Sequence, residues 1–156
     1  MSKHQPALLG GLFIGVLSAL PGVNIANCCC LWVLAGGALV VYLQQQRMPE
    51  PVETADAVIG GLLAGALGAI IYTILTVIIV SAGGAMWMDQ IRGALDANPE
   101  IPAETRDMLL RLFEGRNFIV IGLVINLPLY AVFSMVGSLI GLAIFRKKTP
   151  PVVLQG

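Results

Sequence analysis

Three adjacent cysteines, Cys28-Cys29-Cys30, are the residues whose type is best suited to chemistry. Thiolates that share a metal ion are usually two or more residues apart, so that their sulfurs can converge. Neighbouring residues of a helix point about 100° apart, so three in a row diverge. The single histidine, His4, is far along the chain from them. We interpret the cysteines as small apolar packing residues and predict no metal and no cofactor, with a metal or redox role as the alternative.

Hydroxyl and amide side chains are the polar groups of the long uncharged segments, which contain neither a carboxylate nor a histidine. Acid–base and nucleophilic catalysis usually depend on a carboxylate or a histidine, so we do not expect an enzyme. Helical spacing places several of these side chains near one stripe. The sequence therefore predicts one polar seam between two helices, formed by Thr73, Thr76, Asn126, Ser134 and Ser138.

The composition of the chain is that of a membrane protein. Its 156 residues are 57% hydrophobic and 12% charged, whereas soluble domains have about 45–50% and about 25%. Residues 5–46, 57–88 and 117–145 lack Asp, Glu, Lys and Arg entirely. Each block exceeds the ~20 residues of one bilayer crossing. We predict one integral membrane domain over residues 1–156, surrounded by lipid. Zero net charge and the lack of a basic stripe argue against nucleic-acid binding.

Four transmembrane helices, arranged as two hairpins, are expected in these blocks. The first block is roughly twice the length of one crossing, and Pro21-Gly22-Val23-Asn24 interrupts it. Proline removes a backbone donor, and Gly and Asn tolerate turns, so we expect a hairpin there. The predicted helices cover residues 5–20, 28–45, 54–81 and 118–145, with Gly83-Gly84 ending the third and Pro128 bending the fourth.

A polar segment of about residues 85–116 separates the third and fourth expected helices. Its pattern predicts two amphipathic helices, the second over residues 103–114, followed by Gly115 as a stop signal. We expect them to rest on the bilayer or on the bundle, with docking to a partner as the alternative. Their apolar faces comprise Trp87, Met88, Ile91 and Leu95, and then Met108, Leu109, Leu112 and Phe113.

Glycines recur at four-residue spacing in three of the expected helices. In lipid, close approach of backbones through small residues supplies much of the energy of helix packing. We predict that these glycines pack helices within one bundle, and an oligomer interface is the alternative. The glycines are Gly11 and Gly15, Gly61 and Gly65, and Gly137 and Gly141.

A sequence repeat links the two expected hairpins. Residues 7–12, Ala-Leu-Leu-Gly-Gly-Leu, recur fifty positions later as Ala-Val-Ile-Gly-Gly-Leu. Because the first and third helices should run in the same direction, the repeat predicts hairpins related by an axis along the membrane normal.

Basic flanks indicate the orientation. Arg47 lies between the second and third helices, and Arg146, Lys147 and Lys148 follow the fourth, whereas the basic residues of the long loop are offset by acids. Basic residues accumulate on the cytoplasmic side, so we predict that both termini are cytoplasmic.

The glycine-rich helices and small size resemble the loose group of small four-helix bacterial membrane proteins. This resemblance implies a bacterial inner membrane and no site residue. We expect a non-catalytic scaffold or accessory subunit, whose partners are other membrane proteins or copies of itself. The alternative is a small oligomeric channel or transporter built from two hairpin repeats.

Overall fold

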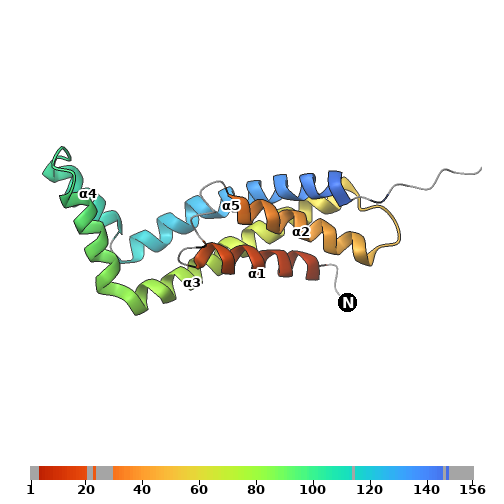
Figure 1. Cartoon of the computed structure of the whole chain (residues 1–156), viewed down its shortest axis with the longest axis horizontal. Coiled ribbons are helices and arrows are strands. Elements are labelled where there is room, and N and C mark those ends of the chain that lie inside the picture. Colours follow the sequence, from red (N-terminus) through yellow and green to blue (C-terminus); the bar gives the residue numbers. More distant parts are fainter. Residues whose placement is uncertain (1–3, 21–22, 24–29, 114, 146, 148–156) are drawn as a thin grey trace, which may run out of the picture.

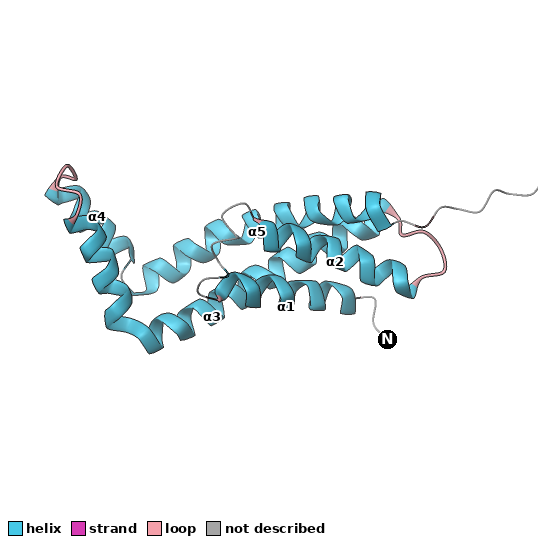
Figure 2. Cartoon of the chain, in the orientation of Figure 1, coloured by secondary structure: helices cyan, strands magenta, loops and turns pink. Residues whose placement is uncertain are grey.

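The computed structural model describes residues 4–20, 23, 30–113, 115–145 and 147. These residues form five α-helices and no β-strand, which confirms the all-helical prediction (Figures 1 and 2). The helices are α1 (Gln5–Ala19), α2 (Leu31–Arg47), α3 (Thr54–Asp96), α4 (Ala103–Phe113) and α5 (Gly115–Phe145).

Four of the helices run lengthwise side by side, and α4 stands apart at one end (Figure 1). Most of the packing is of α1 on α3, α2 on α5, and α3 on α5. The opposite end of the bundle holds Gln5, the α2–α3 loop and Lys147. There Arg47 Nη1 donates to Gln5 Oε1 at 2.8 Å, and Lys147 Nζ donates to the Met48 carbonyl at 3.0 Å.

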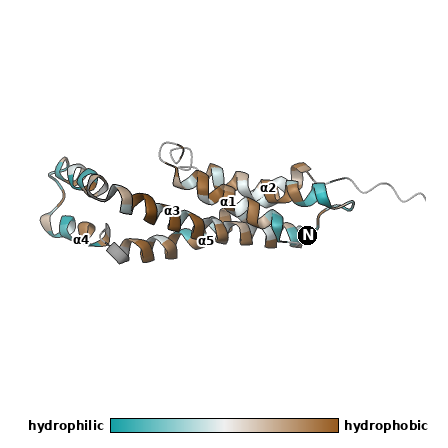
Figure 3. Ribbon diagram, turned by 90° about the horizontal axis from the view of Figure 1, so that it is seen from below, coloured by the Kyte–Doolittle hydropathy of each residue, from teal (hydrophilic) through white to brown (hydrophobic). Residues whose placement is uncertain are grey.

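Two helices are long and apolar enough to cross a bilayer in the part of the chain that the structure describes. They are Thr54–Gly83 of α3 and Phe118–Phe145 of α5, seen as brown ribbons in Figure 3. In their most apolar stretches, only 22% and 11% of the residues are buried. The core helix of a soluble protein would be mostly buried, so these exposed apolar faces have the character of surfaces that meet lipid.

The prediction of four complete crossings is not supported, because α1 and α2 are too short. They have 15 and 17 residues, or about 23 Å and 26 Å of helix at 1.5 Å per residue, against a hydrocarbon core of about 30 Å. The first apolar block is divided between two helices and their connection. Instead of starting at residue 28, α2 starts after Cys30, whose left-handed backbone (φ 52°, ψ 27°) does not continue a helix.

The predicted end of the third helix at residue 81 is wrong. Instead, α3 continues without interruption through Gly83 to Asp96, and it turns where its apolar part ends (Figure 1). Glycine costs a helix only about 1 kcal/mol relative to alanine, so Gly83-Gly84 weakens the helix without ending it. The first expected amphipathic helix is therefore the last part of α3.

The second amphipathic helix, α4, begins at the predicted Ala103, and α5 begins at Gly115, three residues before the predicted start. On α4, Met108 is 57% exposed and Leu112 is 39% exposed, so the bundle does not cover them. Leu109 on α4, and Met88, Ile91 and Leu95 on α3, are half-buried. The side chains of Trp87 and Phe113 lie outside the described residues.

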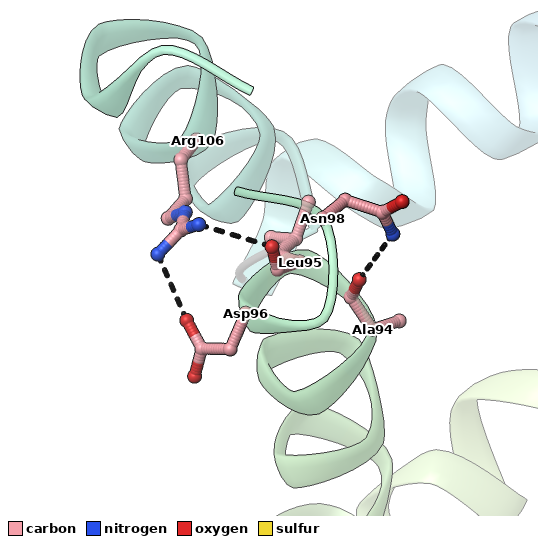
Figure 4. A network of polar contacts seen from close by, with 5 residues as sticks. All are labelled: Ala94, Leu95, Asp96, Asn98 and Arg106. Atoms are coloured by element: carbon pink, nitrogen blue, oxygen red, sulfur yellow. Dashed lines mark hydrogen bonds and ion pairs between the residues drawn. The ribbon is translucent and has the colours of Figure 1, made fainter. Parts of the chain in front are cut away.

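The turn between α3 and α4 is held by Arg106 (Figure 4). Its Nη1 donates to Asp96 Oδ1 at 2.9 Å, and its Nη2 donates to the Leu95 carbonyl at 3.0 Å. Asn98 Nδ2 donates to the Ala94 carbonyl at 2.8 Å. The last carbonyls of a helix carry partial negative charge, so the guanidinium both caps α3 and folds α4 back against its end.

Gln45 ties together the segments at the opposite end of the bundle. Its Oε1 accepts hydrogen bonds from the backbone N–H groups of Val52 at 3.0 Å and Lys147 at 3.3 Å, and its Nε2 donates to the Glu50 carbonyl at 3.0 Å. The side chain is buried, with 4% exposed. One amide therefore links the end of α2, the α2–α3 loop and the residues that follow α5.

Candidate functional site

All six glycines predicted to pack lie at helix crossings within this chain. Gly11 and Gly15 of α1 face α3, Gly61 and Gly65 of α3 face α5, and Gly137 and Gly141 of α5 face α2. At each position a Cβ would overlap atoms of the facing helix. These crossings therefore bring backbones together, as lipid-embedded helices do through small residues.

Glycine doublets in α1, α2 and α3 each face two neighbouring helices, which sequence reasoning missed. Adjacent helical residues point about 100° apart. Gly36 accordingly faces Ile14 of α1, whereas Gly37 faces the Ser134 backbone of α5. The sequence signal was present, because three Gly-Gly pairs occur in the first 61 residues.

The repeated segments do not occupy equivalent positions, so the predicted relation of two hairpins by an axis is wrong. Gly10 and Gly60, which correspond in the repeat, both face α2, through Val40 in each case. Gly11 faces α3, but its counterpart Gly61 faces α5. Hairpins related by a twofold axis would instead place corresponding glycines against corresponding helices.

The predicted polar seam is divided into two separate groups. Ser134 and Ser138 are completely buried where α5 crosses Gly37 of α2 and Gly61 of α3. Thr73, Thr76 and Asn126 instead line a small cavity of about 130 Å³ between α3 and the first half of α5. The two groups lie on either side of the contact between Gly65 and Tyr130.

Two hydroxyl groups of the seam, those of Thr73 and Ser138, bond within their own helices. Thr73 Oγ1 donates to the Ala69 carbonyl at 2.8 Å, and Ser138 Oγ donates to the Met135 carbonyl at 2.7 Å. The buried Oγ atoms of Ser134 and Ser18 make no hydrogen bond with the residues that the structure describes. In the described part of the chain, the hydroxyl groups of these serines and of Thr73 therefore do not donate hydrogen bonds from one helix to another.

A larger cavity of about 400 Å³ lies between the end of α1, the middle of α3 and the start of α5. Tyr72, Thr76 and Phe118 line both this cavity and the smaller one, so the two adjoin. In the part of the chain that the structure describes, the wall contains no charged residue. Its members are Ser18, Ala19, Tyr72, Thr76, Ile79, Val80, Gly83, Met86, Gln90 and Phe118.

The cavity exists because α3 and α5 separate towards α4. On one side of it, the rings of Tyr72 and Tyr130 meet with centroids 5.6 Å apart, and Gly65 then brings the two helices into backbone contact. Beyond that point, α5 contains Pro128, and its two halves are inclined to each other (Figure 1). Proline removes one backbone hydrogen bond and clashes with the preceding turn, which accounts for the bend.

Of the three cysteines, Cys28 and Cys29 lie outside the described residues. Cys30 is half-buried, precedes α2 and packs beside the core of Ile14, Val33 and Val40. In the described part of the chain, no three His, Cys, Asp or Glu side chains gather in a way that could hold a metal ion.

Comparison of the chain with protein-family models, curated proteins and solved structures finds no match.

Proposed function

We propose that this chain is a multi-pass membrane protein that crosses the bilayer completely with α3 and α5. The apolar composition of these two helices (Figure 3) and the small share of their residues that is buried support the proposal. The α1–α2 hairpin enters and leaves from one side, since Gln5 and Arg47 lie together. The last residues of α1, Ser18 and Ala19, lie beside the second half of the α3 crossing. Because α1 and α2 are each too short to cross alone, we propose that this hairpin is re-entrant.

The orientation proposed for the bundle has both termini and the α2–α3 loop in the cytoplasm and α4 outside. Arg47 and Lys147 lie at the first end, and basic residues next to membrane helices favour the cytoplasmic side. We propose that the protein lies in a bacterial inner membrane, because it resembles small, glycine-rich bacterial membrane proteins.

Cysteine labelling should place the two ends on opposite sides of the membrane. The background carries Cys28→Ser, Cys29→Ser and Cys30→Gly, since glycine suits the left-handed backbone of Cys30. An impermeant maleimide should label Glu104→Cys in intact cells, because the side chain is exposed on α4. It should label Glu50→Cys, in the exposed α2–α3 loop, only after the cells are opened. Labelling of both in intact cells would refute the crossing by α3, and the reversed pattern would invert the orientation.

Within the membrane, we propose that the protein is a non-catalytic scaffold or accessory subunit. One observation carries this proposal: Gly65 lies against the backbone of Tyr130 and Ala131. At this crossing α3 and α5 leave no space between them for a polar path, so the two adjoining cavities end there. Tight glycine crossings make a rigid bundle, whose exposed side chains, such as Val124 and Ile144, can meet other subunits.

The alternative proposal is an oligomeric channel or transporter, for which the hydroxyl-lined cavities would supply the wetted surface that conduction needs. The purified chain in liposomes should show no flux of ions or small solutes above that of protein-free vesicles. Native mass spectrometry of the complex extracted from its own membrane should show more than one 16.5 kDa chain or an additional subunit.

The Asn126→Leu variant distinguishes the two functions, because Asn126 lines the smaller cavity without making a helix crossing. If neither the wild type nor Asn126→Leu shows flux, and both are still extracted from the membrane as a complex, the scaffold proposal stands. Saturable flux in the wild type that Asn126→Leu abolishes would instead establish transport.

A further inference from the structure

We infer that the 400 Å³ cavity between α1, α3 and α5 binds an uncharged single-chain lipid with a hydroxyl or carbonyl head group, such as a monoacylglycerol. This inference rests on the proposed membrane location and goes beyond the scaffold function. It depends on the chemistry of the cavity wall, its position along α3 and its size.

The wall has the two kinds of surface that such an amphiphile needs. Ile79, Val80, Met86 and Phe118 provide an apolar lining, and Ser18, Tyr72, Thr76 and Gln90 carry hydroxyl or amide groups. Binding sites for small molecules commonly combine a mostly apolar wall with a few polar groups that fix orientation.

Ser18 gives a second, independent indication of a polar ligand. The residue is completely buried, it belongs to the cavity wall, and its Oγ makes no hydrogen bond with the residues that the structure describes. A buried hydroxyl without a partner costs free energy, which a ligand oxygen would recover.

Among the residues that the structure describes, the wall has no charged side chain, and this determines the class of head group that we propose. A phosphate, carboxylate or ammonium group would leave water without a counter-charge, and burial of an unpaired charge is very costly. A hydroxyl or ester carbonyl needs only neutral hydrogen-bond partners, so the wall selects uncharged lipids.

The cavity extends along α3 from Tyr72, inside the proposed crossing, to Gln90, beyond the end of that crossing at Gly83. Ile79, a wall residue within that crossing, is exposed, so a lipid can enter from the membrane. Its volume lies near the lower end of the ~300–1,000 Å³ of small-ligand sites, which suits one chain better than two.

Photo-crosslinking of the full chain in phosphatidylcholine nanodiscs tests the inference. The probe is a monoacylglycerol with a diazirine in its acyl chain, and adducts are mapped by mass spectrometry. Adducts should concentrate at wall residues such as Ile79, Met86 and Phe118. Unlabelled monoacylglycerol should compete, whereas lysophosphatidic acid with the same chain should not, because its phosphate finds no counter-charge among the described residues of the wall.

Two glycines of α3 provide a matched pair of variants, because a Cβ added to Gly83 or Gly93 meets no atom within 4 Å. Gly83 lies in the cavity wall, and Gly93 does not. Gly83→Phe should fill the cavity and reduce crosslinking by about tenfold or more, while Gly93→Phe should leave it unchanged. Thr76→Val removes one hydroxyl at nearly constant shape and should weaken competition roughly three- to tenfold, as expected for one neutral hydrogen bond.

Adducts spread evenly over outward-facing residues, such as Ile140 and Ile144, would overturn the inference. Equal competition by lysophosphatidic acid would do the same, and this measurement needs only the wild type. If only the lipid inference is wrong, the labelling pattern of Glu104→Cys and Glu50→Cys is still the one expected. If the membrane proposal is wrong, that labelling pattern itself differs from the expected one.

Discussion

Gly65→Ala is expected to lower the free energy of unfolding by about 3 kcal/mol or more, the upper range for an overpacked site. The new Cβ would lie 2.6 Å from the carbonyl carbon of Tyr130 and 2.6 Å from the Cα of Ala131. Both are backbone atoms of α5, so no side-chain rotation can relieve the overlap. The spanning helices must instead move apart, which should be measured by SDS titration of the purified protein.

Two other glycines of α3 serve as controls for Gly65→Ala. In Gly60→Ala, the Cβ meets side-chain atoms and no backbone, namely Gln44 Nε2 at 2.8 Å and Val40 Cγ1 at 2.9 Å, so a smaller loss of about 1 kcal/mol is expected. In Gly93→Ala, the Cβ has open space, and alanine should add up to about 1 kcal/mol of helix stability. Equal stabilities for Gly65→Ala and Gly93→Ala would show that α3 and α5 do not cross at backbone contact.

Gln45→Leu is expected to cost about 2–4 kcal/mol, because it removes three hydrogen bonds while nearly preserving volume. The buried Val52 N–H loses its acceptor, and the Glu50 carbonyl and the Lys147 N–H lose their shared amide partner. Protein stability should fall, and proteolysis or hydrogen exchange in residues 48–53 should increase, since these bonds attach that loop to α2.

The matched control is Gln46→Leu, which changes the neighbouring amide on the exposed side of α2. It should alter stability by less than about 0.5 kcal/mol, as surface substitutions usually do. If Gln45→Leu and Gln46→Leu have the same stability and the same loop protection, then Gln45 does not connect the three segments.

Local patterns determined much of the secondary structure. The polar segment around α4 has a clear amphipathic period, and its start at Ala103 follows from Pro102 and the alternation of charged and apolar residues. The uncharged blocks likewise predicted the two long apolar helices. These features depend on residues that are near one another in sequence, so one sequence is sufficient to predict them.

Local patterns failed where a helix boundary depended on weak signals. Gly83-Gly84 reads as a break, yet α3 continues, because the cost of glycine is small compared with the many hydrogen bonds of a 43-residue helix. The start of α2 depends on the left-handed backbone of Cys30, which nothing in that residue's type predicts.

The sequence by itself determined that the long uncharged segments are apolar on nearly every side and that glycines recur along them. It could not determine which neighbour each glycine faces, because a helix without a polar face gives no periodic signal for its packing side. Only the tertiary structure places Gly10 on α2 and Gly11 on α3, and divides the polar seam at the Gly65 crossing. The same holds for Gln45 and for the cavity beside Ser18, since both arise from atoms that are distant in sequence and close in space.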